Sequence, residues 1–447
     1  MTKKPSKYNT TLRINSDFGV CYNAMSDRFV VLKSQVYDEL CKGDIVGFAK
    51  KYPEPYKQLL DVSAIVDSGV DEARQVHDMI DRVDNDENTF HLHVNPTVDC
   101  NFRCWYCYEN HVNGSRMQPD MVENVKTLME KTIASHRQLK SFVLSFFGGE
   151  PLMYFNAVVK PLMDHLYSLC SRHALQPFVS FTTNGYLLNE KMVEFFDGKD
   201  VSFQITLDGD RERHDKTRFM PTGKGSFDRI VSNIKLLSRY GHSIIMRINY
   251  TADNISSVMR VADEFADLER ECRNLITVDF QRVWQDRDAA QDEDAVDTEM
   301  YMCVKMFYDN GFGVSCSKTN NGVLDSCYGS KRNYALVNYN GDVYQCTARD
   351  FNKENRYGYL SELGDIVYED GLKEKRESAR FSKGVCKSCR IAPICGGGCA
   401  QKAMEFYDKD VCALGFTDAK IDKYVLDRFE YGLLLERMND SATIVSL

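Results

Sequence analysis

Three things are scarce in this sequence of 447 residues: excess positive charge, long apolar runs, and repeated or low-complexity segments. The net charge of −9 leaves no dense basic face for phosphate contact, which argues against an obligate nucleic-acid binder. No stretch of about 18 apolar residues occurs, and the polar start, residues 1–10, lacks the apolar core of a secretion signal. We therefore predict a cytoplasmic protein with neither a membrane nor a nucleic acid as partner.

Cysteine, in contrast, is abundant. The chain has sixteen cysteines, in a composition of 43% apolar and 27% charged residues that is typical of a globular protein. In a reducing compartment cysteines rarely form disulfides, so metal ligation is the leading explanation for those that cluster. The chain length predicts about three domains.

The first cluster of cysteines has the spacing C-x3-C-x2-C, formed by Cys100, Cys104 and Cys107. Three thiolates can hold three corners of a cubane iron–sulfur cluster and leave one iron open, whereas an electron-carrier cluster uses four. The same spacing also suits three ligands of a zinc site, or buried thiols without metal. The spacing alone leaves these alternatives open.

Short apolar strands alternate with helix-like stretches from about residue 89 to 285. This alternation predicts a parallel sheet with helices outside it. Six such units are too few for a closed eight-stranded barrel, so we predict an α/β fold with a partial (β/α)6 TIM-like barrel, whose ligands bind at the carboxyl ends of the strands. The predicted strands are His91–Pro96, Phe142–Phe147, Phe178–Thr182, Val201–Leu207, Ile244–Tyr250 and Ile276–Val283.

The cysteine run, with the aromatic Tyr106 before its last cysteine and a strand in front of it, resembles the signature of radical S-adenosylmethionine (SAM) enzymes. The end of the second strand, Gly148-Gly149-Glu150-Pro151, resembles the motif that binds the amino group of the cofactor in this family. The resemblance implies a [4Fe–4S] cluster whose open iron chelates S-adenosylmethionine. Cleavage of the cofactor then gives a 5′-deoxyadenosyl radical that takes a hydrogen atom from a substrate.

Polar residues also end the later strands. In similar enzymes these positions surround the ribose and the carboxylate of the cofactor. Thr206 is the best candidate for a ribose contact, and Asn184, Arg218 and Asn249 are further candidates. Asn-Gly and Asp-Gly sequences also form simple turns, so a structural role for these residues stays open.

The C-terminal third resembles the SPASM domain of peptide and protein maturases, which carries two auxiliary [4Fe–4S] clusters. All seven cysteines of its pattern are present. The two auxiliary clusters are called nearer and distal by their distance from the cluster that binds S-adenosylmethionine. Carried over by position, the ligands of the distal cluster would be Cys386, Cys389, Cys395 and Cys412, and those of the nearer cluster would be Cys327, Cys346 and Cys399. Cys316 is the candidate for the missing eighth ligand; otherwise one iron stays open to a substrate thiolate. Zinc is the alternative for the spacing C-x2-C-x5-C-x3-C.

The first 88 residues are expected to form a separate α+β unit, with a hairpin of Leu12–Val20 and Arg28–Leu32 followed by helices around Ser34–Cys41 and Asp71–Val83. The unit resembles the winged-helix-like recognition element of peptide maturases, which adds a precursor's leader as an edge strand. A purely structural cap on the barrel is the alternative. The predicted domains are residues 1–88, the barrel at 89–310, the loop-rich SPASM domain at 311–418, and a closing helix and tail at 419–447.

Together these resemblances imply an oxidoreductase that installs an oxidative cross-link in a ribosomally synthesised precursor peptide. A thioether is the leading candidate for the bond formed, and a C–C or C–O bond is the alternative. It would use three [4Fe–4S] clusters, S-adenosylmethionine and an electron donor such as flavodoxin or ferredoxin. One alternative is formylglycine generation on a protein target. Against it, the sulfatase maturases carry an aspartate after the cysteine of the G-x4-C unit, where this chain has Thr347 after Cys346. A non-catalytic metal-binding or electron-transfer protein is the alternative of another class. The catalytic base is not predicted.

Overall fold

The computed structural model describes residues 2–283, 285, 293–316, 320–369 and 371–438. The chain divides into two compact units, each assembled from separate segments. Unit 1 comprises residues 1–86, 318–332 and 371–447, and unit 2 comprises residues 87–317 and 333–370. No helix within the described ranges is both long and apolar enough to cross a membrane.

Unit 2 is built on one sheet in the order β12-β11-β10-β9-β8-β7-β6-β13-β14-β15-β16. Its first eight strands are parallel to their neighbours, and the last three are antiparallel. The strands are β6 (Thr89–Val94), β7 (Ser141–Phe146), β8 (Gln176–Thr183), β9 (Val201–Thr206), β10 (Ser243–Tyr250), β11 (Ile276–Arg282), β12 (Gly313–Cys316), β13 (Tyr334–Val337), β14 (Asp342–Tyr344), β15 (Gly358–Leu360) and β16 (Ile366–Tyr368).

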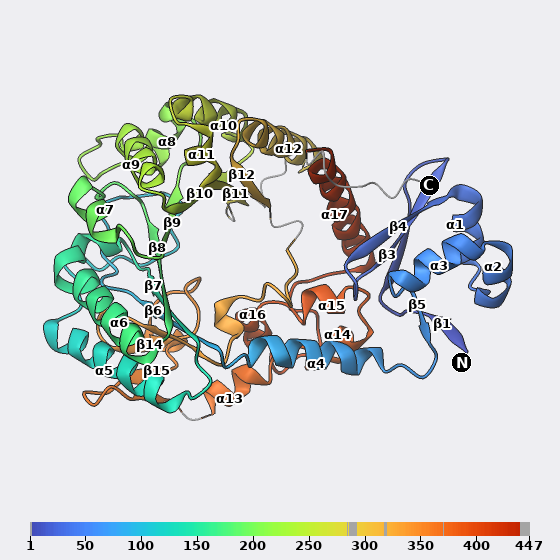
Figure 1. The fold of residues 1–447 in the computed structure, drawn as a ribbon, viewed down its shortest axis with the longest axis horizontal. Coiled ribbons are helices and arrows are strands. Elements are labelled where there is room, and N and C mark those ends of the chain that lie inside the picture. The colour runs from blue at the N-terminus through green and yellow to red at the C-terminus, as the bar shows by residue number, and fades with distance from the viewer. Residues whose placement is uncertain (1, 284, 286–292, 317–319, 370, 439–447) are drawn as a thin grey trace. The chain divides into compact units, whose positions relative to one another are not determined.

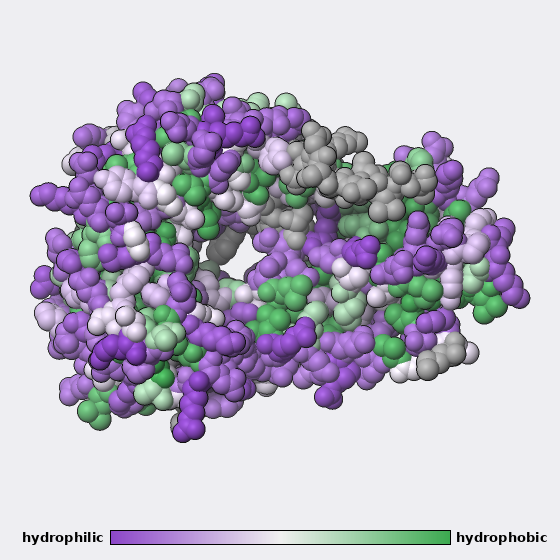
Figure 2. Space-filling view, viewed as in Figure 1, coloured by the Kyte–Doolittle hydropathy of each residue, from purple (hydrophilic) through white to green (hydrophobic). Residues whose placement is uncertain are grey.

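The helices of unit 2 follow the parallel strands along the chain, and Figure 1 shows α5, α6, α7 and α9 along the outer side of the sheet. Hydrophilic residues cover most of their outward surface (Figure 2). The helices are α5 (Pro119–Ser135), α6 (Lys160–His173), α7 (Glu190–Phe196), α8 (Arg211–Thr217), α9 (Phe227–Arg239), α10 (Ile255–Val258), α11 (Arg270–Asn274) and α12 (Glu293–Asp309). The predicted α/β fold with six strand–helix units is confirmed. The sheet extends further than predicted, because β12 and β13 add a parallel strand at either side.

Strand β6 shows how the sheet is packed. Phe90, Leu92 and Val94 are buried on one face, as alternation requires for a face under helices. The opposite face carries His91 and His93, whose rings stack with centroids 4.6 Å apart. The His91 Nε2 atom lies 2.7 Å from the Ser145 hydroxyl of the neighbouring strand β7. The inner face of the sheet therefore carries polar side chains on β6 and β7.

These buried histidines predict a loss of stability in acid. Burial lowers the pKa of His91 to about 4 and that of His93 well below its ordinary value, so both rings stay neutral in the folded protein. The unfolded chain binds protons at these two histidines at pH values where the folded chain does not. Their contribution to the free energy of unfolding is therefore fully present above about pH 6.5 and decreases below it. For His91 alone we expect a loss of about 2 kcal/mol between pH 7 and 5. Urea unfolding of the metal-free protein across this range measures the loss, and His91→Gln should make it smaller. An equal pH dependence in the variant would contradict the assignment.

Unit 1 combines the N-terminal segment with the C-terminal one. Its strands are β1 (Lys3–Pro5), β2 (Asn9–Arg13), β3 (Phe18–Asn23), β4 (Arg28–Lys33) and β5 (Ile65–Asp67). Its helices are α1 (Ser34–Cys41), α2 (Ile45–Lys51), α3 (Pro53–Asp61), α4 (Glu72–Asp84), α13 (Leu372–Glu377), α14 (Gly384–Ser388), α15 (Ala392–Cys395), α16 (Ala400–Glu405) and α17 (Asp418–Met438). The strands form a sheet β2-β3-β4 and a pair β1-β5.

The predicted N-terminal hairpin is partly wrong. The segment expected as one strand, Leu12–Val20, is broken into β2 and β3 by a turn. Asn15 causes this break, because its side-chain oxygen accepts hydrogen bonds of 2.9 Å from the backbone N–H groups of Asp17 and Phe18. The sheet therefore has three strands instead of two.

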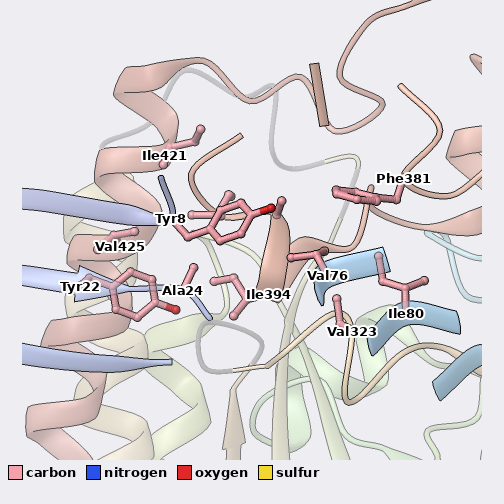
Figure 3. Packing of buried hydrophobic residues seen from close by; sticks show 12 residues of the cluster. Tyr8, Tyr22, Ala24, Val76, Ile80, Val323, Phe381, Ile394, Ile421 and Val425 are labelled. Carbon is pink, nitrogen blue, oxygen red and sulfur yellow. The ribbon is translucent and has the colours of Figure 1, made fainter. Parts of the chain in front are cut away.

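One apolar core joins the early and late segments of unit 1. Tyr8 and Tyr22 from the N-terminal segment and Val76 of α4 pack with Ile394 of α15 and Val425 of α17 (Figure 3). The Arg428 side chain of α17 adds a hydrogen-bonded ion pair with Asp27. The predicted closing helix, residues 419–438, is therefore part of the core of unit 1; the tail, residues 439–447, lies outside the described residues.

Candidate active site

The three cysteines of the first motif lie in the loop after β6, at the carboxyl end of the parallel strands of unit 2. Burial raises the pKa of Cys100 to about 12 and also raises the pKa values of Cys104 and Cys107. A buried thiol loses its proton readily only when a cation compensates the thiolate, as a bound metal does. The chemistry of this donor set fits an iron–sulfur cluster. No three His, Cys, Asp or Glu side chains in the described part of the chain lie close enough to hold a single metal ion.

The Gly148-Gly149-Glu150 turn after β7 packs directly on this loop. The backbone N–H of Glu150 donates to the carbonyl of Asp99 at 2.9 Å, one residue before Cys100. A Cβ on Gly149 would lie 2.1 Å from the same carbonyl oxygen, closer than real atoms approach. These glycines therefore let the cysteine loop come close to the turn.

Gly149→Ala should therefore prevent normal cluster assembly, because the clash is with backbone that cannot rotate away. We expect the variant to be poorly soluble or to contain about four fewer irons per chain after reconstitution. Gly432→Ala is the control, because its added Cβ would meet nothing within 4 Å. Full iron content in Gly149→Ala would contradict this close-packing argument.

Glu150 is completely buried and its carboxylate is held by three donors. The Oε1 atom accepts from the Leu152 N–H at 3.0 Å and from the Thr183 hydroxyl at 2.7 Å, and Oε2 accepts from the Asn184 N–H at 2.8 Å. Burial raises the pKa of Glu150, and these three hydrogen bonds oppose the rise. The predicted residues Glu150 and Asn184 are thus brought into contact.

A second group of predicted residues meets at the Tyr106 hydroxyl. Arg218 donates to it at 2.7 Å and the Asn249 side chain at 3.1 Å, while the hydroxyl itself donates to Asp208. Burial raises the pKa of Asp208, and the guanidinium of Arg218 opposes this rise. Thr206, at the end of β9, lies in register with Arg247 of β10 and is half-buried.

Asp208 and His214 are not among the predicted site residues. Asp208 binds Tyr106, and its own backbone N–H donates to Nδ1 of the buried His214 at 3.2 Å. Because Nδ1 accepts this bond, Nε2 of His214 carries the proton and donates to the Ser226 hydroxyl oxygen, 3.0 Å away. Asp208 precedes a glycine at a strand end, so the sequence indicated only a turn.

Two buried donors near the cysteines lack an acceptor. Nε of Arg218 and Nδ2 of Asn101 have no hydrogen-bond partner within the described residues. The Arg218 guanidinium carbon lies 5.8 Å from the centre of the Phe102 ring, beside the cysteine loop. Such donors are costly to bury unless a bound group accepts from them. They fit the carboxylate of an aminoacyl ligand.

Four of the C-terminal cysteines share one cavity in unit 1. Its volume is about 450 Å³, and its lining includes Cys386, Cys389, Cys395 and Cys412, the four residues predicted for the distal cluster. Burial raises the pKa of Cys395 to about 12 and that of Cys386 to about 11, with the neighbouring cysteines adding to the effect. The cavity and its four thiols fit a metal cluster.

The three cysteines predicted for the nearer cluster belong to different units. Cys327 and Cys399 belong to unit 1, and Cys346 belongs to unit 2. Cys316 ends β12, but its side chain lies outside the described residues. The remaining cysteines lie outside both cysteine motifs. Cys21, Cys170 and Cys303 are buried, whereas Cys41 is exposed and Cys272 is half-buried.

Comparison with known proteins places this site in a family. The model of the radical SAM superfamily matches residues 94–265. A cysteine-type anaerobic sulfatase-maturating enzyme of Clostridium novyi is 25% identical over 321 residues, 67% of this chain and 85% of that protein. An uncharacterized protein of Methanocaldococcus jannaschii is 32% identical over 154 residues, 34% of this chain and 49% of that protein, so the chain spans about half of it.

Two solved structures share the fold. The structure of native anSMEcpe with bound AdoMet and Cp18Cys peptide has a TM-score of 0.57 and 18% identity, over 79% of this chain and 100% of that one. Streptococcus suis SuiB bound to precursor peptide SuiA has a TM-score of 0.50 and 15% identity, over 90% of this chain and 96% of that one. The family match covers the cysteine loop and the ends of β7 to β10 described above. Residues 94–265 are therefore a radical SAM domain, which implies a [4Fe–4S] cluster and S-adenosylmethionine as its cofactors.

Proposed function

We propose that this chain is a peptide maturase that installs an oxidative cross-link in a ribosomally made precursor peptide, with a thioether as the leading candidate for the bond formed. The observation that carries the proposal is the second set of thiols, Cys386, Cys389, Cys395 and Cys412, around one cavity outside the radical SAM domain. Cofactor cleavage alone needs only the first set. A further cluster held by these four thiols would supply an electron acceptor for an oxidative reaction.

In the proposed site each residue group has a separate task. Cys100, Cys104 and Cys107 would hold the cluster, which together with S-adenosylmethionine would supply the radical chemistry. Glu150 accepts from the amino group of the cofactor, and the unpaired donors of Arg218 and Asn101 bind its carboxylate. Thr206 and Asn249 bind the ribose, and the glycines position Glu150 beside the cysteine loop.

The nearer auxiliary cluster remains part of the proposal. Cys327, Cys346 and Cys399 supply three ligands, and Cys316 supplies the fourth. The total is then three [4Fe–4S] clusters, with electrons delivered by a flavodoxin or a ferredoxin.

The N-terminal module of β2–β4 and α1–α3 is proposed to recognise the precursor. The order β2-β3-β4 leaves β2 and β4 as edges of a small antiparallel sheet. An extended leader can add to such an edge through backbone hydrogen bonds. The precursor-bound SuiB structure, which shares the fold of this chain, supports a peptide as substrate.

Formylglycine generation is the second candidate, because the Clostridium novyi relative is a sulfatase-maturating enzyme and the chain spans most of it. Thr347 argues against this activity. It follows Cys346, where the sulfatase maturases carry an aspartate that acts as the base. A threonine hydroxyl does not accept a proton at neutral pH.

Co-expression with the short reading frames that flank the gene tests the proposal. A thioether gives a peptide that has lost two hydrogen atoms and whose cysteine resists alkylation. Formylglycine instead gives an aldehyde that a hydrazide reagent captures. Anaerobic protein that binds iron but releases no 5′-deoxyadenosine under reducing conditions would overturn both candidates and leave an electron-transfer protein.

A further inference from the structure

The carboxylate of Glu150 has one unused acceptor position, and the structure shows which oxygen carries it. Each carboxylate oxygen accepts about two hydrogen bonds. Both positions on Oε1 are taken, by the Leu152 N–H and the Thr183 hydroxyl, whereas Oε2 accepts only from the Asn184 N–H among the residues that the structure describes. A cofactor amino group at Glu150 is therefore left with Oε2.

The end of strand β8 determines this arrangement. Two of the three donors to Glu150 come from the consecutive residues Thr183 and Asn184, although Glu150 itself follows β7. The Thr183 hydroxyl also accepts from the Gly185 N–H at 3.0 Å, so its proton points to Glu150 and its lone pair to the turn. Thr183 is 5% exposed, so water does not compete for these bonds.

The same turn also contacts the cysteine loop. The Asn184 side-chain nitrogen donates to Oδ1 of Asn101 at 2.8 Å and lies 3.9 Å from the sulfur of Cys100. The Asn184 oxygen in turn accepts from the Tyr186 N–H at 3.0 Å. One short turn thus touches both the carboxylate proposed for the amino group and a cysteine proposed for the cluster.

We propose that Thr183 is a positioning residue that fixes the rotamer of Glu150, so that the free acceptor position of Oε2 faces the amino group of S-adenosylmethionine. Thr183 acts through Glu150 and need not touch the cofactor. Asn184 holds the other oxygen through its backbone and ties the turn to the cysteine loop. The inference rests on the proposed role of Glu150 in cofactor binding.

Thr183→Val tests this, because valine keeps the shape of threonine and removes both hydrogen bonds of the hydroxyl. A hydrogen bond to a buried charge typically contributes enough for a tenfold or larger effect, so we expect the dissociation constant for S-adenosylmethionine to rise about 10- to 100-fold. It is measured on the anaerobically reconstituted full chain from the change in the cluster's electron paramagnetic resonance signal on titration with S-adenosylmethionine. Iron content and the signal without the cofactor should match the wild type.

Two further variants separate positioning from general structure. Thr183→Ser keeps the hydroxyl and should restore binding to within a few-fold of the wild type. Thr132→Val removes a buried hydroxyl in α5, away from the site, and should leave binding unchanged. Wild-type affinity in Thr183→Val would overturn the inference, and so would a Thr183→Ser variant as weak as Thr183→Val. If the wild type itself neither binds nor cleaves S-adenosylmethionine, the proposed function fails instead.

Discussion

Cys104→Ala should eliminate 5′-deoxyadenosine formation and leave most of the iron in the protein. With only two thiolates in the loop after β6, the site cannot hold three corners of a cubane. The cysteines proposed for the auxiliary clusters lie elsewhere in the chain, so about eight of about twelve irons should remain after reconstitution. Iron analysis and chromatography of the reaction with dithionite and S-adenosylmethionine measure both quantities.

Cys272→Ser is the matched control for this experiment. Cys272 is a half-buried cysteine of α11 in the same unit, outside both cysteine motifs. Its replacement should leave iron content and cofactor cleavage at wild-type levels. Loss of all iron in Cys104→Ala would show that the three proposed clusters are not independent. Continued cofactor cleavage would contradict the assignment of Cys104.

Much of this site could be predicted because its residues follow strands. Parallel strands bring their carboxyl ends to one edge, so Cys100, Glu150 and Asn184 could be expected close together from sequence order alone. The strand pattern was strong, since all six predicted segments have buried alternating or continuous apolar residues, on β6, β7, β8, β9, β10 and β11. The site residues therefore followed from the fold.

The hydrogen-bond partners could not be predicted in the same way. Tyr106, Asp208 and Asn249 are far apart in the chain, and their meeting depends on side-chain directions that strand order does not determine. The role that we propose for Thr183 could not be predicted for the same reason, because a threonine at a strand end usually reflects only strand propensity. The close contact between Gly149 and the Asp99 carbonyl could not be predicted either, because a glycine indicates that a neighbour lies close but not which neighbour it is.

Cys395→Ala should lower the iron content of the protein and the thermal stability of unit 1. Cys395 ends α15 and lines the thiol cavity, and it packs beside the core that contains Ile394 and Val425. A cluster bound to Cys395 and to Cys412 would tie α15 to the segment before α17, so its loss removes a cross-link as well as metal. We expect about four fewer irons per chain and a loss of a few kcal/mol, which would lower the Tm by roughly 10 °C.

Cofactor cleavage distinguishes the two thiol sets in this variant. The radical SAM domain lies in unit 2 and keeps its own cysteines, so Cys395→Ala should still release 5′-deoxyadenosine while no cross-linked peptide is formed. Ser388→Ala is the control, because Ser388 lines the same cavity but offers no thiolate, and it should keep its iron and its Tm. Zinc in the wild-type cavity, or full iron content in Cys395→Ala, would refute the distal cluster. Wild-type cross-linking by a Cys395→Ala protein that has lost this iron would instead show that the distal cluster is structural, because the thiols would then stabilise unit 1 without carrying an electron.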